Sequence, residues 1–218
     1  MRNLVIFGDT PFAERLFKYI HIEAKDRVIA FTQEREYITQ NTLQGLPVLP
    51  FEDLGELEQE FEIILGIGYT KMNLLKAQIY SMCESKGYKG ATYISSNAVV
   101  YTDEIQDGCF IAPGALVGPG CKLGKGNYLA SSVVLSHDNT FGNFNFLSTN
   151  AVFGGFSRVE DHCFFGLHST IKDDVIVASH SLIGSAANVL QSIPQMGMVF
   201  VGNPARPLKG KESLTTKI

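Results

Sequence analysis

The chain has 218 residues, a formal net charge of −4 and 45% hydrophobic residues, which suits one large domain or two modest ones with buried cores. It contains no Lys/Arg-rich run and no apolar run of membrane-spanning length, so we expect neither nucleic-acid binding nor membrane insertion. The four cysteines form no CxxC pair and the N-terminus lacks a signal-peptide pattern. Together these features predict free thiols, no zinc knuckle and a cytoplasmic protein.

Residues 1–93 alternate strand-like and helix-like patterns. The run NLVIFG ends at Gly8 like a buried parallel strand, and Thr10 and Pro11 supply an N-cap and a first helical residue for the next stretch. This order implies a small parallel sheet with right-handed crossovers, which is a Rossmann-like domain. The predicted elements are strand 3–8, helix 10–24, strand 27–32, strand 61–68, helix 71–87 and strand 88–94.

From Val99 onward the pattern becomes an internal repeat with a period of six residues. Every sixth residue up to Val189 is aliphatic or phenylalanine, and the residue four positions later is usually small. Such a period is typical of a parallel β-helix, in which large apolar residues fill the interior and small ones fit the crowded wall. We therefore expect residues 94–218 to form a β-helix with a C-terminal tail, and we interpret Cys109 and Cys163 as small core residues.

The repeat resembles that of the left-handed β-helix acyltransferases, whose triangular coil takes three six-residue units. The handedness comes from this resemblance, because the crossover rule alone predicts the opposite hand. A Rossmann-like domain before such a helix is similar to the two-domain sugar acyltransferases, which include sialic acid O-acetyltransferases and N-acetyltransferases of nucleotide-linked 4-amino sugars. The segments that carry the resemblance are GLPVLPFEDL at 45–54, LGIGYTKMN at 65–73, SHDNTFG at 136–142 and VFVGNPARPLKG at 199–210.

This resemblance implies an acetyltransferase of cell-surface polysaccharide biosynthesis. The expected fold is a small Rossmann-like α/β domain followed by a left-handed parallel β-helix. A homotrimer is implied, with acetyl-coenzyme A as co-substrate, a nucleotide-linked amino sugar as acceptor and no metal. Transfer to a sugar hydroxyl is the alternative within the same class.

His137 lies at the position of the family's catalytic histidine, and the resemblance implies that the adjacent Asp138 orients it. The chemistry needs a base, because an amine or hydroxyl that attacks a thioester must lose a proton, and imidazole accepts one near neutral pH. One coil further along the repeat is Gly155, whose missing side chain leaves room for a carbonyl or a pantetheine arm beside the imidazole. We therefore predict that His137 is the general base.

The sequence departs from the family at two positions near the predicted base. Related enzymes often have Asn seven residues before the catalytic histidine and a second His nine residues after it, and here these residues are Ala130 and Phe146. The departures predict altered substrate contacts or a different acyl group. They also leave open a non-catalytic member of the family.

The turn after the first strand is the expected nucleotide-sugar site, because parallel sheets present ligands at the carboxyl ends of their strands. The GxGxxG fingerprint is absent, since GDTPFA keeps only its first glycine, so dinucleotide binding is not expected. The predicted substrate-binding residues follow three strands at this edge of the sheet: Gly8, Asp9, Thr10, Thr32, Gly68 and Tyr69.

Coenzyme A is implied by the resemblance to lie in a groove between neighbouring helices, with backbone near Gly155, Leu167 and Gly184 lining its pantetheine arm. The terminal segment would follow the adenine and phosphate end. There Asn203 and Arg206 are the expected contacts, since a cation suits the 3′-phosphate.

Three further histidines leave a metal-dependent alternative open. His162 and His180 are eighteen residues apart, hence predicted to stack on one face, whereas His168 lies one face away. The γ-class carbonic anhydrases use three histidines on this helix type, but residues on different faces converge only across a subunit boundary. We therefore expect surface histidines, and a metal-dependent hydratase remains the alternative.

Overall fold

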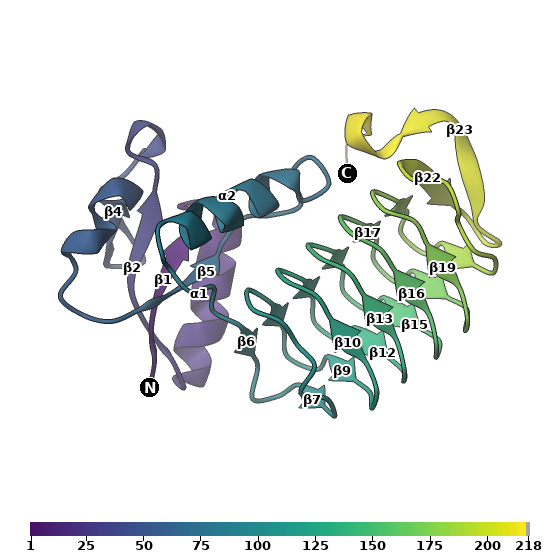
Figure 1. Cartoon of the computed structure of the whole chain (residues 1–218), viewed down its shortest axis with the longest axis horizontal. Coiled ribbons are helices and arrows are strands. Elements are labelled where there is room, and N and C mark those ends of the chain that lie inside the picture. The colour runs from purple at the N-terminus through teal and green to yellow at the C-terminus, as the bar shows by residue number, and fades with distance from the viewer. Residues whose placement is uncertain (217–218) are drawn as a thin grey trace.

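The computed structural model describes residues 1–216, and its N-terminal part is built on a five-stranded sheet with the order β3-β4-β2-β1-β5 (Figure 1). The β3–β4 pair is antiparallel and the other three pairs are parallel. The elements of this part are β1 (Asn3–Phe7), α1 (Pro11–Glu23), β2 (Arg27–Gln33), η1 (Arg35–Tyr37), β3 (Thr42–Leu43), β4 (Leu46–Pro50), η2 (Phe51–Glu56), β5 (Glu62–Leu65) and α2 (Leu74–Ser85).

The helix predicted over 10–24 is confirmed, with Thr10 as N-cap and Pro11 in the first turn of α1. The strand predicted over 88–94 is wrong as a strand of this sheet. Gly90 makes only an isolated bridge to Ile63, and the strand that follows pairs with the β-helix instead. The sheet gains β4 in its place, a prolyl strand that the sequence pattern does not predict. Prolines are tolerated there because β4 is next to the edge of the sheet, where Pro47 faces the two-residue strand β3 and Pro50 is the last residue of β4.

The rest of the chain winds into a left-handed parallel β-helix with three faces (Figure 1). Strands one coil apart pair in parallel, as in Tyr128↔Phe146 and Val134↔Val152. From Ile111 to Val189 every sixth residue is at most 3% exposed, which confirms the six-residue period as the interior of the prism. The predicted start of the repeat at Val99 is wrong, because Val99 is 45% exposed and Val100 pairs with the inward Val117. The strands of the first two coils and the start of the third are β6 (Tyr93–Ile94), β7 (Val99–Val100), β8 (Phe110–Ile111), β9 (Leu116–Val117), β10 (Lys122–Leu123), β11 (Tyr128–Leu129) and β12 (Val134–Leu135).

The later coils keep the same register, and a hairpin follows them. The remaining strands are β13 (Thr140–Phe141), β14 (Phe146–Leu147), β15 (Val152–Phe153), β16 (Arg158–Val159), β17 (Phe164–Phe165), β18 (Thr170–Ile171), β19 (Ile176–Val177), β20 (Leu182–Ile183), β21 (Asn188–Val189), β22 (Met198–Val201) and β23 (Arg206–Glu212), followed by η3 (Ser213–Thr215). The β22–β23 pair is antiparallel, and β22 continues the parallel stack beside β20.

The three faces of the prism carry different outward side chains. We call them the covered face (β8, β11, β14 and β17), the apolar face (β7, β9, β12 and β15) and the polar face (β10, β13, β16 and β19). The apolar face presents Val99, Leu116, Val134 and Val152 and, in its last two strands β18 and β21, the polar Thr170 and Asn188. The polar face presents Lys122, Thr140, Arg158 and the apolar Ile176. The N-terminal part of the chain packs against the covered face and its corners, as in the Tyr80–Phe144 and Tyr19–Ser131 contacts.

A column of stacked aromatic rings runs along the covered face and joins the two parts of the molecule. Successive ring centroids are 5.0, 5.4, 4.6 and 5.5 Å apart with interplanar angles of 14–20°. On its outer side Phe12 and Tyr19 of α1 and the loop residue Tyr69 pack against it. Each such aromatic pair contributes about 0.5–1.5 kcal/mol beyond the area that it buries. The members of this aromatic column are Tyr93, Phe110, Tyr128, Phe146 and Phe164.

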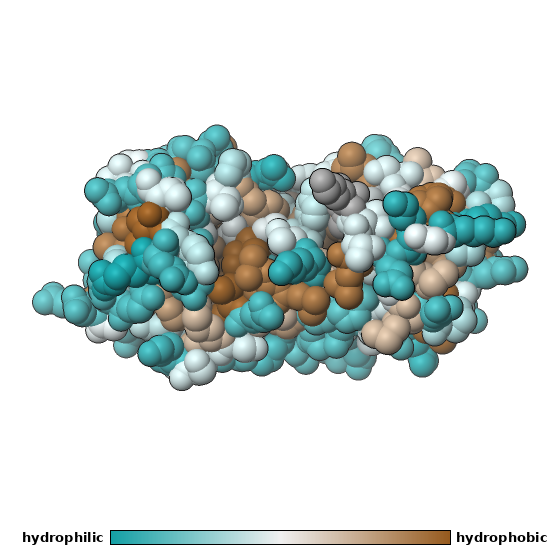
Figure 2. Space-filling model, turned by 90° about the horizontal axis from the view of Figure 1, so that it is seen from above, coloured by the Kyte–Doolittle hydropathy of each residue, from teal (hydrophilic) through white to brown (hydrophobic). Residues whose placement is uncertain are grey.

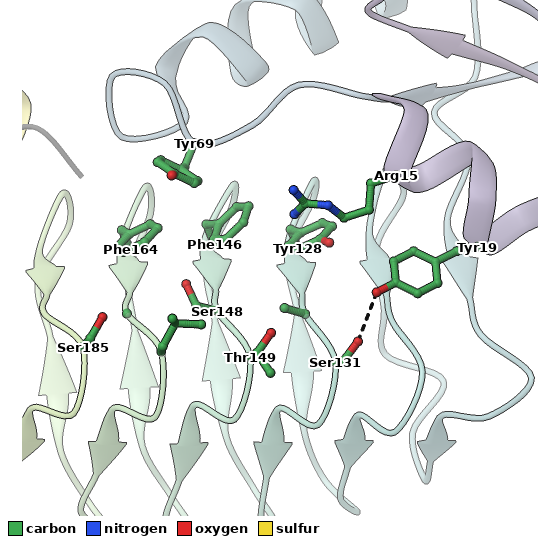
Figure 3. A pocket seen from close by; sticks show the side chains of 13 residues that line it. Arg15, Tyr19, Tyr69, Tyr128, Ser131, Phe146, Ser148, Thr149, Phe164 and Ser185 are labelled. Atoms are coloured by element: carbon green, nitrogen blue, oxygen red, sulfur yellow. Dashed lines mark hydrogen bonds between the residues drawn. The ribbon is translucent and has the colours of Figure 1, made fainter. Parts of the chain in front are cut away.

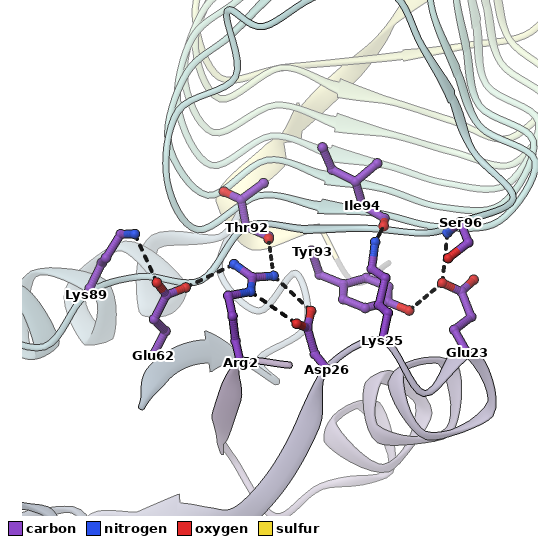
Figure 4. Close-up of polar contacts among 10 residues, drawn as sticks. All are labelled: Arg2, Glu23, Lys25, Asp26, Glu62, Lys89, Thr92, Tyr93, Ile94 and Ser96. Atoms are coloured by element: carbon purple, nitrogen blue, oxygen red, sulfur yellow. Dashed lines mark hydrogen bonds and ion pairs between the residues drawn. The ribbon is translucent and has the colours of Figure 1, made fainter. Parts of the chain in front are cut away.

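Ion pairs and hydrogen bonds fasten the base of the N-terminal part to the first coil (Figure 4). Arg2 bonds Asp26 at 2.8 Å and also donates to the Thr92 carbonyl. Glu23 accepts hydrogen bonds from Tyr93, Ser95 and the Ser96 amide. Burial alone raises the pKa of Glu23, but these donors outweigh it and lower the pKa to about 2.

Helix α2 carries a buried lysine between the N-terminal part and the β-helix. Lys76 is 3% exposed, and its ammonium lies 5.5 Å from the ring centroid of Tyr128. Among residues 1–216 it has no carboxylate partner. Burial lowers the pKa of Lys76 to about 8, because the low-dielectric surroundings disfavour the charged form.

None of the helices within residues 1–216 is both long and apolar enough to cross a membrane.

We expect Lys76→Met to raise the free energy of unfolding at pH 7 by about 1–3 kcal/mol, because an unpaired buried cation is replaced by an apolar chain of similar shape. Relative to Lys76→Met, the wild-type chain should gain stability as the pH rises from about 8 to 10.5, since the unfolded lysine binds its proton more tightly than the folded one over that interval. The difference in the free energy of unfolding between the two chains should therefore shrink. Denaturant titrations at several pH values measure both effects, with exposed Lys86→Met as the control; a variant less stable than wild type at pH 7 would contradict the prediction.

Candidate functional site

His137 lies on the corner between β12 and β13, where the apolar face meets the polar face. Its Nδ1 is 2.9 Å from Oδ2 of Asp138, and the two side chains are 45% and 50% exposed. The corner places Asp138 in the left-handed region at φ +52°, a conformation that Asp tolerates better than most residues. Because its amide donates to the Pro119 carbonyl at 2.9 Å, the carboxylate is held beside the ring. The predicted histidine–carboxylate pair is therefore formed.

The imidazole lies directly over Gly155, one coil away as the repeat predicts, so the ring itself fills the space that was expected for a carbonyl or a pantetheine arm. A Cβ at Gly155 would be 2.3 Å from Cε1 and 2.5 Å from Nε2 of His137, so only glycine fits beneath the ring in this position. On the next residue, the ring of Phe156 meets the imidazole edge-on with centroids 5.1 Å apart. The imidazole is thus supported on two sides and open to the surface of the apolar face.

A cleft of about 310 Å³ lies between the N-terminal part and the opposite corner of the prism, where the covered face meets the apolar face (Figure 3). Its floor consists of Tyr128, Phe146 and Phe164 from the aromatic column. Its roof comes from α1 and the loop after β5. The roof residues are Arg15, Tyr19 and Tyr69, and a hydroxyl rim of Ser131, Ser148, Thr149 and Ser185 completes the lining with Ala130, Gly166 and Leu167.

Hydrophobic surface gathers at this junction of the N-terminal part and the β-helix, as the space-filling view shows (Figure 2). Polar groups are set around it. The Tyr19 hydroxyl lies 3.3 Å from Oγ of Ser131, which ties α1 to the rim. The cleft therefore combines an aromatic surface with a row of hydroxyl groups, a combination that suits a polyol with one apolar side.

Ala130 and Phe146, the two departures from the family pattern, both line this cleft. Phe146 belongs to the aromatic column and is 5% exposed, and Ala130 is 8% exposed. Both departures therefore make the lining of the same cleft more apolar.

His137 and the cleft occupy different corners of the same prism, on either side of the apolar face. Strand β12 (Val134–Leu135) runs from the cleft corner to the histidine corner, and its outward residue Val134 pairs with Val152 of the next coil. Within one copy, the predicted base consequently does not reach the cleft.

Two of the predicted substrate residues have structural roles inside the N-terminal sheet. Thr32 is fully buried, and its hydroxyl donates to the Leu49 carbonyl at 2.9 Å. The amide of Gly8 donates to the Thr32 carbonyl at 2.7 Å, and a Cβ at Gly8 would lie 2.9 Å from the Gly66 carbonyl oxygen. Since its hydroxyl is used inside the sheet, Thr32 is removed from the candidate set as a correction, and Gly8 is explained by close packing.

The remaining turn residues lie near the start of α1, outside the cleft lining. Asp9 accepts a hydrogen bond from Thr39 at 3.1 Å, and Thr10 caps α1 without a side-chain bond. Gly68 stands against the ring of Phe12, 3.9 Å from an added Cβ. Of the predicted substrate residues, Tyr69 alone lines the cleft.

The predicted coenzyme A residues are divided between the two corners of the apolar face. Gly155 belongs to the histidine corner, whereas Leu167, 51% exposed, belongs to the cleft corner. Gly184 lies beneath β22, because a Cβ there would be 2.9 Å from Cγ1 of Val201.

The tail residues of this set lie after β22. Asn203 accepts a hydrogen bond from Asn188 at 3.1 Å, and Arg206 starts the exposed strand β23. One copy of the chain therefore does not gather the predicted coenzyme A residues into a single groove.

The other histidines are corner residues. His162 and His180 stack with centroids 5.0 Å apart and an interplanar angle of 3°, as predicted, and Phe144 extends their stack. These two and His168 share the left-handed corner position at φ 56–60°, which His adopts more readily than most residues. Parallel stacked rings do not converge on a point, and within residues 1–216 no group of three or more His, Cys, Asp or Glu is arranged to hold a metal ion.

Sequence reasoning missed Arg15 and Tyr19, both of which enter the cleft from α1. Their signal is helical spacing, since Phe12, Arg15 and Tyr19 follow one another at three and four residues and therefore share one face of the helix. Which partner that face meets depends on how the helix docks, and the spacing alone does not state it.

Neither a protein-family model nor a curated protein matches the sequence. Solved structures do match its fold over nearly the whole chain. The acetyltransferase domain of PglB from Neisseria gonorrhoeae, in complex with acetyl coenzyme A, is 23% identical with a TM-score of 0.82, and the match covers 95% of this chain and 99% of that one. WeeI from Acinetobacter baumannii is 22% identical with a TM-score of 0.68 and coverage of 95% and 100%.

A further match is a His-to-Asn mutant of perosamine N-acetyltransferase from Caulobacter crescentus in complex with CoA and GDP-perosamine. It is 19% identical with a TM-score of 0.84, and the match covers 97% of this chain and 98% of that one. These similarities establish that the chain has the two-part β-helix fold of sugar acetyltransferases.

The stacked histidines should make the stability of the fold sensitive to acid. Burial lowers the pKa of His162, and the neighbouring His180 lowers it further, although Asp161 and the Met72 carbonyl act in the opposite direction. The folded pKa lies below 6.5, so the unfolded chain binds more protons and the free energy of unfolding should fall as the pH drops below about 6.5.

We expect His162→Phe, which extends the aromatic stack of Phe144, to flatten this acid limb. Thermal denaturation between pH 5 and 8 measures it, and the same substitution at exposed His168 is the control. An unchanged pH profile in His162→Phe would rule out this histidine as the cause.

Proposed function

We propose that this protein is an acyl-coenzyme A-dependent acyltransferase that transfers acetyl, or a similar acyl group, to the amino group of a nucleotide-linked amino sugar. The observation that carries the proposal is the His137–Asp138 pair, 2.9 Å apart on an open corner and seated on a glycine, in a fold otherwise known from sugar acetyltransferases. A general base needs access to its substrate, a fixed orientation and a carboxylate that orients the ring, and the corner that bears His137 provides all three.

The imidazole would act through its free nitrogen. With Nδ1–H donating to Asp138, Nε2 is left unprotonated and accepts a proton from the acceptor amine as that amine attacks the acyl carbonyl. The carboxylate then stabilises the imidazolium that forms. The co-substrate supplies an acyl group already activated as a thioester, so no acyl-enzyme is needed.

The division of candidate residues between two corners supports an assembly in which the apolar faces meet. Val134 and Val152 point outward on that face, and Val152 is 38% exposed. Packing these faces around a threefold axis would bring the histidine corner of one copy against the cleft corner of the next. The corner of His137 and Gly155 in one copy and Leu167 of its neighbour would then line the same groove, which is where we place the pantetheine arm.

We place the sugar in the cleft and its nucleotide toward Asp9 and Thr10 at the start of α1. The aromatic floor and hydroxyl rim suit a sugar ring, and a helix N-terminus suits the charge of a diphosphate. Arg206 on the exposed strand β23 is available for the 3′-phosphate of coenzyme A. Four buried free cysteines are compatible with a cytoplasmic protein.

Mass spectrometry of reactions with acetyl-coenzyme A and a panel of nucleotide-linked sugars tests the function. An acetylated amino sugar with no change in the matched hydroxy sugar is the expected result. Acetylation of the hydroxy sugar instead would favour the O-acyltransferase alternative. No product with any acceptor, together with no binding of acetyl-coenzyme A, would refute the proposal.

Substitution of the predicted base should remove turnover and spare the fold. We expect His137→Asn to lower kcat by about 10²–10⁴-fold, the range for loss of a general base. Gly155→Ala should lower kcat by about 10²-fold, because its Cβ would meet the imidazole at 2.3 Å and displace it. Gly55→Ala, whose Cβ would come no closer than 3.8 Å to Tyr88, is the control and should retain activity. Steady-state rates with circular dichroism of each variant measure this, and full activity in His137→Asn would exclude the base assignment.

A charge on the apolar face should abolish assembly and activity together. We expect Val152→Glu to sediment as a monomer with no turnover, and Thr140→Glu on the polar face to retain both properties. An active Val152→Glu monomer would contradict the shared site.

Mixing two inactive variants provides a second measurement. His137→Asn and a cleft-blocked Thr149→Trp, unfolded and refolded together, should recover activity in about one quarter of the sites, since each site takes its base and its cleft from different copies.

A further inference from the structure

Arg15 is a cation with no acidic partner in the described part of the chain. It projects from α1 over Tyr128 and into the cleft (Figure 3). On the same helix, one residue before it, Glu14 pairs with Lys18 instead, at 3.9 Å. The lining of the cleft includes one cation, three phenols, four hydroxyl side chains and no carboxylate. An anionic ligand would therefore meet one attractive charge and no repulsive charge.

Arg15 is an exposed residue whose guanidinium lies over the ring of Phe12. Its Cζ lies 5.6 Å from the ring centroid of Phe12, which itself packs on Tyr128 at 5.2 Å. Burial raises the pKa of Tyr128 to about 12, so the phenol below the guanidinium stays neutral and does not compete as an anion. A planar, supported guanidinium binds phosphate or carboxylate through two parallel hydrogen bonds.

We propose that Arg15 is a specificity-determining residue that binds an anionic group, a phosphate or a carboxylate, on the acceptor in the cleft. This inference rests on the proposed acyltransferase function for its kinetic consequences, and on the cleft alone for binding. At about 310 Å³ the cleft is at the small end of ligand pockets, so it has room for a sugar ring with one adjacent anionic group and not for a whole nucleotide.

The position of Arg15 also sets the direction of the acceptor. The cation stands on the roof beside Tyr19, whereas Ser131 and Thr149 lie at the opposite rim, next to the apolar face (Figure 3). An acceptor anchored by its anion at Arg15 would present the far side of its ring to that rim. The rim is where His137 of a second copy would arrive in the proposed assembly.

Kinetics of Arg15→Gln test the role in turnover. With an anionic acceptor we expect KM to rise about 10–100-fold while kcat changes less than about threefold, the range for loss of hydrogen bonds to a charged group. Arg15→Lys keeps the charge without the planar fork and should recover part of the loss. Lys18→Gln, which removes an exposed cation of α1 outside the cleft, should behave as wild type. An unchanged KM in Arg15→Gln would overturn the proposal.

Binding without turnover separates this inference from the proposed function and identifies the source of the anion. Thermal shifts with pyrophosphate and with glucuronate test a phosphate and a carboxylate in turn, and glucose is the neutral control. Stabilisation of wild type by at least one anion, lost in Arg15→Gln and kept in Lys18→Gln, is expected even if no acyl transfer is found. If neither anion stabilises the wild-type chain, or if Arg15→Gln responds equally, Arg15 is not an anion-binding residue.

Discussion

The aromatic column on the covered face is the contact on which the arrangement of this molecule depends. Tyr128 and Phe146 stack at 4.6 Å in the middle of the column, and α1 lays Phe12 against both. A β-helix face of this kind would otherwise expose five large rings to water, and burying one such side chain is worth about 1.5–3 kcal/mol. The column therefore holds the N-terminal part at one face and at one height along the prism. The cleft is the part of this interface that α1 and the Tyr69 loop leave unfilled.

The two faces that the N-terminal part leaves uncovered, the polar face and the apolar face, differ in their outward side chains. The polar face, with Lys122 and Arg158 pointing outward, suits contact with water, whereas the apolar face with Val134 and Val152 does not. The candidate base and the cleft lie on the two edges of that apolar face. The two edges of the apolar face lie apart in the rigid prism of a single copy. The proposed chemistry therefore depends on assembly, in which the apolar faces of several copies meet.

Much of this could be predicted from residue order. A six-residue period specifies a β-helix because each buried position of the repeat must be apolar. The same period places Gly155 beneath His137 one coil away. It also predicts the stacking of His162 and His180. Each corner of the β-helix has one residue in the left-handed backbone conformation. This residue is Gly108, Gly114 or Gly120 in the early coils and Ser132, Asp138 or His162 in later ones. The later histidines are thereby explained as turn residues, since a short polar or imidazole side chain tolerates this backbone better than a branched one.

The sequence by itself determined the period, the interior of the prism, the helix at 10–24 and the pairing of His137 with Asp138, because all of these depend on neighbours in the chain or on a fixed repeat. Tertiary structure decided the rest. Because α1 docks onto the aromatic column, Arg15 lines the cleft. Tyr93 belongs to the β-helix and not to the predicted sheet, and Thr32 is buried in the core. Those outcomes depend on which surfaces pack together across large sequence separations, and helical spacing or strand pattern contains no information on the partner.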